Sequence, residues 1–327
     1  MASVLHVLNG EGTAYGFRDS GVDGDYLVWN EALCEGPVHW PADSPEFYAA
    51  RAAFLKEAYG GTVDEHGEVD DSDKYGDLVL DGVEQLRECG QYDRIVLWFE
   101  FDLFCQVNLL YLLKWFHLYP FDGVLEMVSP GAHAEVEPFY GMGQLSPAQL
   151  AGVYAERGVI GSELVEAGAW LWDLYAGKDA MALFEAIETI PEGLPHLKEA
   201  LYAHFGRFPD SVSGMNHVEF VTMRYFVGRA KKPGDLFRAF MKECPVYGFG
   251  DLQYFSYLRG LMPDLVRVEG EKLMITEAGD DVCNLKVGRD GFSAPVRWVG
   301  GVRVEGNKSP YIYDYYERRL NLAPTST

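Results

Sequence analysis

The chain has 327 residues, more than one hydrophobic core usually serves, so two domains are expected. Its composition, 48% apolar and 24% charged, is that of an ordinary globular protein. The net charge of −23 is concentrated: residues 1–211 hold 11 Lys and Arg against 36 Asp and Glu, whereas residues 212–290 hold 11 of each. Such a negative field repels polyanions, so binding to nucleic acid or to anionic membranes is disfavoured.

The N-terminus lacks a basic segment followed by an apolar one, and no apolar stretch reaches the length of a membrane span. These features predict a cytoplasmic protein. The five cysteines are scattered without Cys-x-x-Cys spacing, and the histidines show no metal-ligand spacing. Neither a disulfide framework nor a zinc site is indicated, and the cysteines are expected to be reduced thiols.

Residues 1–150 alternate between strand and helix patterns, which predicts a Rossmann-like α/β domain with a mainly parallel sheet and helices on both faces. Strands are expected at 4–8, 26–29, 94–99 and 123–128, and helices from about 13, at 45–59, at 76–89, at 103–117 and from Pro147, with Ser146 as the N-cap. The acidic stretch at 64–77 fails the spacing of a calcium loop, so a solvated loop is expected there.

The remainder of the chain divides into three parts. Residues 151–211 show helical periodicity and are expected to form a helical connector. Residues 212–290 present helix patterns at 216–227, 235–243 and 251–261, then strands at 265–269 and 272–276, which is the order of a winged-helix-like α+β domain. Residues 291–327 form a tail, rich in tyrosine, that is expected to pack on another domain.

The segment from Ile95 to Asn108 carries the strongest site signal, because a buried strand ends in two carboxylates and then opens an apolar helix. Ligands of open α/β sheets bind beyond the carboxyl ends of the strands, which is where Glu100 and Asp102 stand. Glu35 follows the second predicted strand in the same way. Glu100, Asp102 and Glu35 are therefore the predicted catalytic residues.

The turn after the first strand has two interpretations. Its glycines and the N-terminus of the following helix are suited to cradle an anion, which makes Asn9, Gly10, Glu11 and Thr13 the predicted cofactor-binding residues. It is equally a plain strand-to-helix turn capped by Thr13, because the dinucleotide and P-loop spacings are absent and Glu11 would repel a phosphate.

Five carboxylates would meet above the sheet if these loops converge: Glu11, Glu31, Glu35, Glu100 and Asp102. Crowded carboxylates do not all stay ionised, so one takes up a proton at a raised pKa or a cation such as Mg²⁺ neutralises them. The first outcome suits general acid–base catalysis, and the second would let the site bind phosphate or polarise a carbonyl group. The alternative is that several of the five cap helices or face solvent. No pattern identifies a set of metal ligands.

Several motifs resemble those of one bacterial family. They are Leu5-His6…Asn9-Gly10, Leu33-Cys34-Glu35-Gly36-Pro37, Leu97-Trp98-Phe99-Glu100…Asp102-Leu103-Phe104-Cys105-Gln106, Gly141…Gly143-Gln144-Leu145-Ser146 and Tyr247-Gly248-Phe249-Gly250-Asp251. Over nearly the whole chain they resemble the family called domain of unknown function 1835, with the Trp-Phe-Glu-x-Asp-Leu run as the most specific part. The resemblance implies a Rossmann-like domain followed by a winged-helix-like region, without a particular activity. Where that family often has Asn-Gly-Asp-Ser, this chain has Asn9-Gly10-Glu11-Gly12, which removes a serine nucleophile.

Two functional hypotheses follow. In the first, an acidic strand-end crevice binds a small molecule, for example as a divalent-cation-assisted hydrolase or transferase acting on a phosphorylated metabolite, while the winged helix packs within the chain or in a homodimer. In the second, the protein is a metabolite-sensing transcriptional regulator that uses the winged helix. The third helix, 251–261, offers only Gln253 and Arg259 as readers of bases, which favours the first hypothesis.

Overall fold

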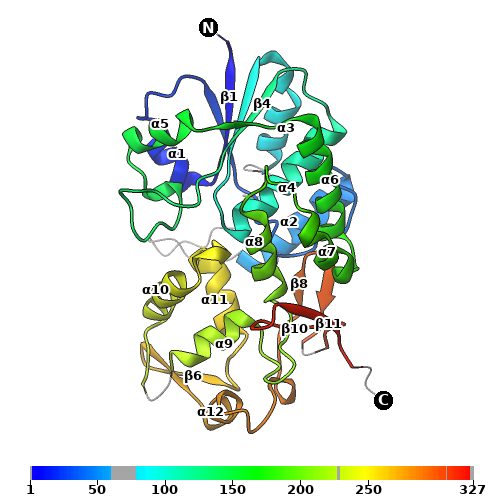
Figure 1. The fold of residues 1–327 in the computed structure, drawn as a ribbon. Coiled ribbons are helices and arrows are strands. Elements are labelled where there is room, and N and C mark those ends of the chain that lie inside the picture. Colours follow the sequence, from blue (N-terminus) through cyan, green and yellow to red (C-terminus); the bar gives the residue numbers. More distant parts are fainter. Residues whose placement is uncertain (1, 60–78, 227–228, 307, 325–327) are drawn as a thin grey trace.

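The computed structural model describes residues 2–59, 79–226, 229–306 and 308–324. It is a mixed α/β protein with a five-stranded, mostly parallel sheet (Figure 1). The sheet contains β1 (Val4–Asn9), β2 (Asp25–Trp29), β3 (Arg94–Trp98), β4 (Val124–Val128) and β5 (Gly158–Val159), in the order β2-β1-β3-β4-β5. The first four strands are parallel, and β5 runs antiparallel to β4. Because β2 and β3 flank β1 on opposite sides, the chain reverses its winding direction between β1 and β3.

The central strands are buried on both faces of the sheet, which explains their continuous apolar sequences. Ile95 and Leu97 of β3 face the larger core, whereas Val96 and Trp98 face the smaller one. The larger core is covered by α2 (Pro45–Tyr59), α3 (Asp81–Arg87) and α4 (Leu103–Leu118), and the smaller one by α1 (Glu11–Phe17) and α5 (Pro147–Ala155) (Figure 1). The sheet is therefore the middle layer of three.

Helix α4 lies at the centre of the molecule. Twelve of its sixteen residues are buried, because the sheet covers one side while α6 (Ser162–Ala176) and α8 (Leu197–Phe205) pack on another. A helix buried on all sides is apolar all round, which is the sequence pattern of this segment. Among the described helices, including α4, none combines the length and the apolar character that crossing a membrane requires.

The C-terminal part lies against the edge of the sheet where the parallel strands end (Figure 1). It contains α9 (His217–Arg224), α10 (Pro233–Glu243), α11 (Asp251–Arg259), the hairpin of β6 (Val266–Glu269) with β7 (Lys272–Ile275), and α12 (Glu277–Cys283). Two further hairpins follow, β8 (Arg297–Val299) with β9 (Val302–Val304), and β10 (Tyr311–Asp314) with β11 (Arg319–Leu322). Their buried residues form one continuous cluster with the larger core of the sheet.

The tail makes specific contacts with the helical segment that precedes α9. The Tyr313 main-chain N–H donates to the Pro209 carbonyl oxygen at 2.9 Å. The Gly301 N–H donates to the Tyr175 carbonyl oxygen, also at 2.9 Å, and Arg207 donates to the Trp298 carbonyl oxygen. These contacts hold the two terminal hairpins on the helices that cover α4.

The strands and most helices of the first half are confirmed to within one or two residues, including the Ser146 capping box that starts α5. One cap prediction is wrong: α1 begins at Glu11 with Gly10 as its N-cap, so Thr13 lies inside the first turn. Helix α12 was not predicted, because seven residues are too few for a periodic pattern. The acidic stretch at 64–77 and the start of the expected helix at 76–89 lie outside the described residues.

Candidate functional site

The carboxyl ends of β1 and β3 lie side by side at the point where the winding of the sheet reverses. Leu8 pairs with Trp98, so Asn9 and Phe99 stand at the same level and Glu100 follows directly. Ligands of open α/β sheets bind at such a reversal, outside the strand ends. The structure brings together three of the predicted site residues here, namely Asn9, Glu100 and Asp102.

Cys105, in the first turn of α4, connects these three residues. Asn9 Nδ2 donates to Cys105 Sγ at 2.9 Å, and the thiol donates to Glu100 Oε2 at 3.2 Å. The same sulfur lies 3.5 Å from Asp102 Oδ2. Burial, followed by the charges of Asp102 and Glu100, raises the pKa of the Cys105 thiol well above its usual value. Cys105 is therefore a hydrogen-bonding link and not a thiolate nucleophile.

Glu100 and Asp102, called the carboxylate pair below, are only 6% and 4% exposed. Burial is the main cause that raises the pKa of both groups, and the charge of Glu100 further raises the pKa of Asp102, to about 7. Two main-chain donors act in the opposite direction: Met142 N–H donates to Glu100 Oε1 at 2.6 Å, and Cys105 N–H donates to Asp102 Oδ1 at 2.8 Å. The two groups are coupled, and the raised pKa of both favours protonation of the pair relative to exposed carboxyl groups.

Two glycines from distant segments cover the carboxylate pair. A Cβ atom on Gly141 would lie 2.6 Å from Glu100 Oε1, which is closer than real Cβ atoms approach an oxygen. A Cβ atom on Gly248 would overlap Asp102 Oδ1, and Gly248 also has a φ of +62°, where glycine is favoured. The backbone of both segments therefore packs directly against one oxygen of each carboxyl group.

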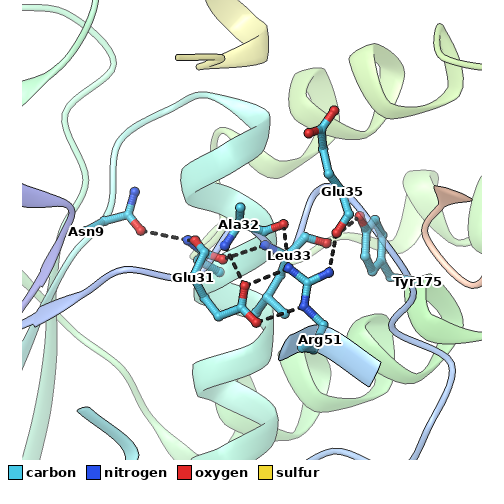
Figure 2. A network of polar contacts seen from close by, with 8 residues as sticks. Asn9, Glu31, Ala32, Leu33, Glu35, Arg51 and Tyr175 are labelled. Atoms are coloured by element: carbon cyan, nitrogen blue, oxygen red, sulfur yellow. Dashed lines mark hydrogen bonds and ion pairs between the residues drawn. The ribbon is translucent and has the colours of Figure 1, made fainter. Parts of the chain in front are cut away.

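A second buried carboxylate, Glu31 in the loop after β2, is neutralised by an arginine (Figure 2). Arg51 of α2 holds Glu31 with two hydrogen bonds, Nε to Oε1 at 2.8 Å and Nη2 to Oε2 at 2.7 Å. Arg51 also donates to the carbonyl oxygens of Ala32 and Glu35, so it fixes the loop after β2. Asn108 of α4 joins this loop to the site, because its Nδ2 donates both to the Glu31 carbonyl oxygen at 2.7 Å and to Asn9 Oδ1 at 2.8 Å.

Sequence reasoning missed Arg51. The residue is fully buried, and its signal is its position four residues after the buried Phe47, on the core-facing side of α2. A charged residue on such a face needs a buried partner, which the sequence does not identify.

The other predicted residues take different positions. Glu35 is 8% exposed, and its carboxylate points away from Arg51 (Figure 2). Its charge adds to the burial that raises the pKa of Cys34, and it contributes to the raised pKa of Arg207 and of Arg297, which burial alone would lower. Glu11 is exposed, 3.9 Å from Arg18. Gly10 forms the turn with a φ of +83°, and Thr13 is a buried residue in the first turn of α1. A cluster of five carboxylates is therefore not formed, because Glu11 lies outside it and Glu31 is paired.

The described residues do not fit Mg²⁺. Within the described ranges, no three His, Cys, Asp or Glu side chains are placed to hold a metal ion. One oxygen of Glu100 and one of Asp102 already accept main-chain hydrogen bonds, which leaves few free lone pairs for a cation that prefers six oxygen ligands. Crowded carboxylates are expected to be neutralised either by protonation or by a cation, and this geometry favours protonation.

The fold and the site together define a mixed α/β protein with a buried carboxylate pair of raised pKa at its strand ends. No protein-family model matches the chain, and no curated protein matches it in sequence. The resemblance to the domain of unknown function 1835 family remains a prediction from the motifs. Segments of all five motifs contribute to the region around β1 and β3, through Asn9, Glu35, Glu100, Gly141 and Gly248.

Proposed function

We propose that this chain is a Rossmann-like small-molecule-binding protein whose ligand occupies the ends of β1 and β3 and exchanges a proton with the carboxylate pair. The observation that carries the proposal is the position of two buried carboxyl groups with raised pKa at the reversal point of the sheet. Groups perturbed in this way concentrate at functional sites. Membership of the domain of unknown function 1835 family, which the motifs suggest, is part of the same proposal.

The charges around the pair favour a ligand that donates hydrogen bonds, such as an amine or an amino alcohol. Both members of the pair are buried carboxyl groups, and an ionised member accepts hydrogen bonds and attracts positive charge. The buried arginines Arg51 and Arg207 already donate to the carbonyl oxygens of Glu35 and Cys34. A phosphorylated metabolite, the ligand considered from the sequence, would therefore have to bring its own cation.

A carboxyl group and a carboxylate side by side supply an acid and a base at the same pH. In a hydrolase or transferase, the ionised member would take the proton of the attacking water, hydroxyl or amine, and the protonated member would donate to the leaving group. Neither step calls for a metal ion. We extend the proposal to such chemistry, with Glu100 and Asp102 as the acid–base residues and Asn9 as a contact for the ligand.

A thermal-shift screen tests the proposal. Amines, amino alcohols and sugar phosphates are tested with and without Mg²⁺, on the wild type, on Asp102→Asn and on the control Glu199→Gln, which alters an exposed carboxylate. A ligand at about 100 times its Kd stabilises the protein by roughly 2.7 kcal/mol. An amine should stabilise the wild type and Glu199→Gln but not Asp102→Asn. Stabilisation by a sugar phosphate only with Mg²⁺ would contradict the proposal and favour metal-assisted chemistry.

A metabolite-sensing regulator is the second candidate, because the elements of residues 212–290 follow the order of a winged helix. Three helices precede the β6–β7 hairpin, and Lys231, between α9 and α10, forms an antiparallel bridge with Leu273 of β7, as the first strand of a winged helix does. The position of α11 favours protein contact over DNA reading, since α11 starts just after Gly248, beside the carboxylate pair.

A gel shift with random duplex DNA at low salt separates the two candidates, because low salt strengthens any real phosphate contact. We expect no submicromolar complex. Such a complex would favour the regulator.

A further inference from the structure

A pocket of about 520 Å³ lies between the loop after α8, the helix α9 and the turn that joins β10 to β11. Sites for small molecules have volumes of about 300–1,000 Å³. None of the residues that line this pocket belongs to the strand-end site, so it is a separate cavity.

Aromatic rings line part of its wall, among them Phe208, Phe220, Tyr315 and Tyr316. The His217 ring stacks on Tyr315 with ring centroids 3.5 Å apart and planes 11° from parallel. The other side of this stack is held in place, because His217 Nδ1 lies 3.0 Å from the Tyr247 hydroxyl oxygen. A fixed pair of parallel rings is a platform on which a further planar ring can stack.

The rim of the pocket exposes three large apolar side chains that come from three different segments. Val212 is 67% exposed, Leu285 is 54% exposed and Tyr316 is 81% exposed. Leu285 adopts a φ of +56°, which is uncommon for a residue with a bulky side chain. Single exposed apolar residues are ordinary, but their convergence around one cavity marks a binding surface.

The polar groups of the lining set the charge of the ligand. Asp210, Glu243 and Asp314 are acidic, whereas Arg224 is the one basic residue among those that line the pocket. Arg224 forms an ion pair with Glu243 at 3.2 Å, so the negative charge of the lining that this arginine does not neutralise comes from Asp210 and Asp314. Burial lowers the pKa of His217 to about 4, so its ring is neutral at pH 7 and does not repel a cation.

We propose that this pocket is a second binding site, for a planar aromatic amine that stacks on the Tyr315 and Tyr316 side of the cavity while its ammonium group faces the acidic residues. The inference does not depend on the function proposed for the strand ends. It names a ligand class from the aromatic wall, the apolar rim and the negative lining, which are three separate observations.

Calorimetric titration with tryptamine tests the site, alongside indole-3-acetate, which has the same ring with a negative charge, and hexylamine, which has the charge without the ring. Tryptamine should bind in the millimolar range or tighter, and each of the other two roughly tenfold more weakly or not at all. Equal binding of tryptamine and either indole-3-acetate or hexylamine, or no binding of tryptamine at millimolar concentrations, would overturn the proposal.

Two variants locate the binding. Tyr316→Ala removes an exposed ring from the rim and should weaken tryptamine roughly three- to tenfold, whereas Tyr15→Ala, which removes an equally exposed ring (82%) on α1, should leave the affinity unchanged. Glu243→Gln should weaken tryptamine but not neutral indole. If Tyr15→Ala weakens tryptamine as much as Tyr316→Ala, the amine binds elsewhere and the assignment is wrong.

Discussion

Two buried acidic sites lie at the strand ends, and they are neutralised in different ways. Glu31 receives two hydrogen bonds from Arg51, whereas Glu100 and Asp102 receive only main-chain N–H and thiol donors in the contacts described above. The first site has a fixed charge balance and holds a loop. The second must gain or lose a proton to change its charge. An acidic group is thus structural or reactive according to its partner.

The largest expected effect comes from breaking the ion pair. Arg51→Met leaves the Glu31 carboxylate buried without its cation, which should cost about 3–5 kcal/mol of unfolding free energy. Urea denaturation measures this cost. The matched control is Arg318→Met, which breaks the exposed pair with Glu199 and should cost no more than about 1 kcal/mol. Equal costs for the two variants would mean that Glu31 is solvated or protonated without Arg51.

The second-largest expected effect is the pH dependence that the carboxylate pair contributes to the unfolding free energy. Burial raises the pKa of Asp102 to about 7, so between about pH 4 and 7 the folded protein binds more protons than the unfolded chain. The contribution of the pair to stability therefore decreases as pH rises through this window, by about 2 kcal/mol between pH 5 and 7. Urea unfolding of the wild type and of Asp102→Asn at both pH values measures it.

The comparison with Asp102→Asn is necessary because four histidines whose pKa is lowered by burial act in the opposite direction: His6, His39, His204 and His217. Burial lowers the pKa of His6 and of His217 to about 4, so the unfolded chain binds the extra protons and stability falls as pH drops below about 6.5. The wild type and Asp102→Asn both retain these histidines, so the histidine contribution cancels when their unfolding free energies are subtracted. A difference that is flat from pH 5 to 7 would show that Asp102 ionises normally in the folded protein.

The smallest expected effect tests how closely the backbone at Gly248 packs against Asp102. Gly248→Ala and Gly270→Ala both place a side chain at a φ near +60°, but only Gly248 has Asp102 in the way, since a Cβ on Gly270 would meet nothing within 4 Å. Gly248→Ala should therefore cost about 1–2 kcal/mol more than Gly270→Ala in urea unfolding. If the two costs agree, the loop moves away from Asp102 without penalty.

The sequence predicted the strand ends well, because Trp98-Phe99-Glu100 and Ser146-Pro147 carry local signals: an apolar run that stops at a charge, and a helix cap. It did not predict that Arg51 would meet Glu31 or that Gly248 would meet Asp102, since such contacts depend on how distant segments dock. It also overestimated the carboxylate cluster, because spacing along the chain does not reveal that Glu11 turns to solvent. Local patterns determine elements, whereas long-range packing determines which carboxyl group keeps a proton.

The contact between Gly248 and Asp102 affects how the site forms while the chain is being synthesised. A ribosome that adds about 5–20 residues per second needs on the order of ten seconds to travel from one residue to the other. During that interval the segment that packs on Asp102 has not yet been synthesised. A copy that is truncated before Gly248 would contain the strands of the sheet but lack the backbone that packs on Asp102.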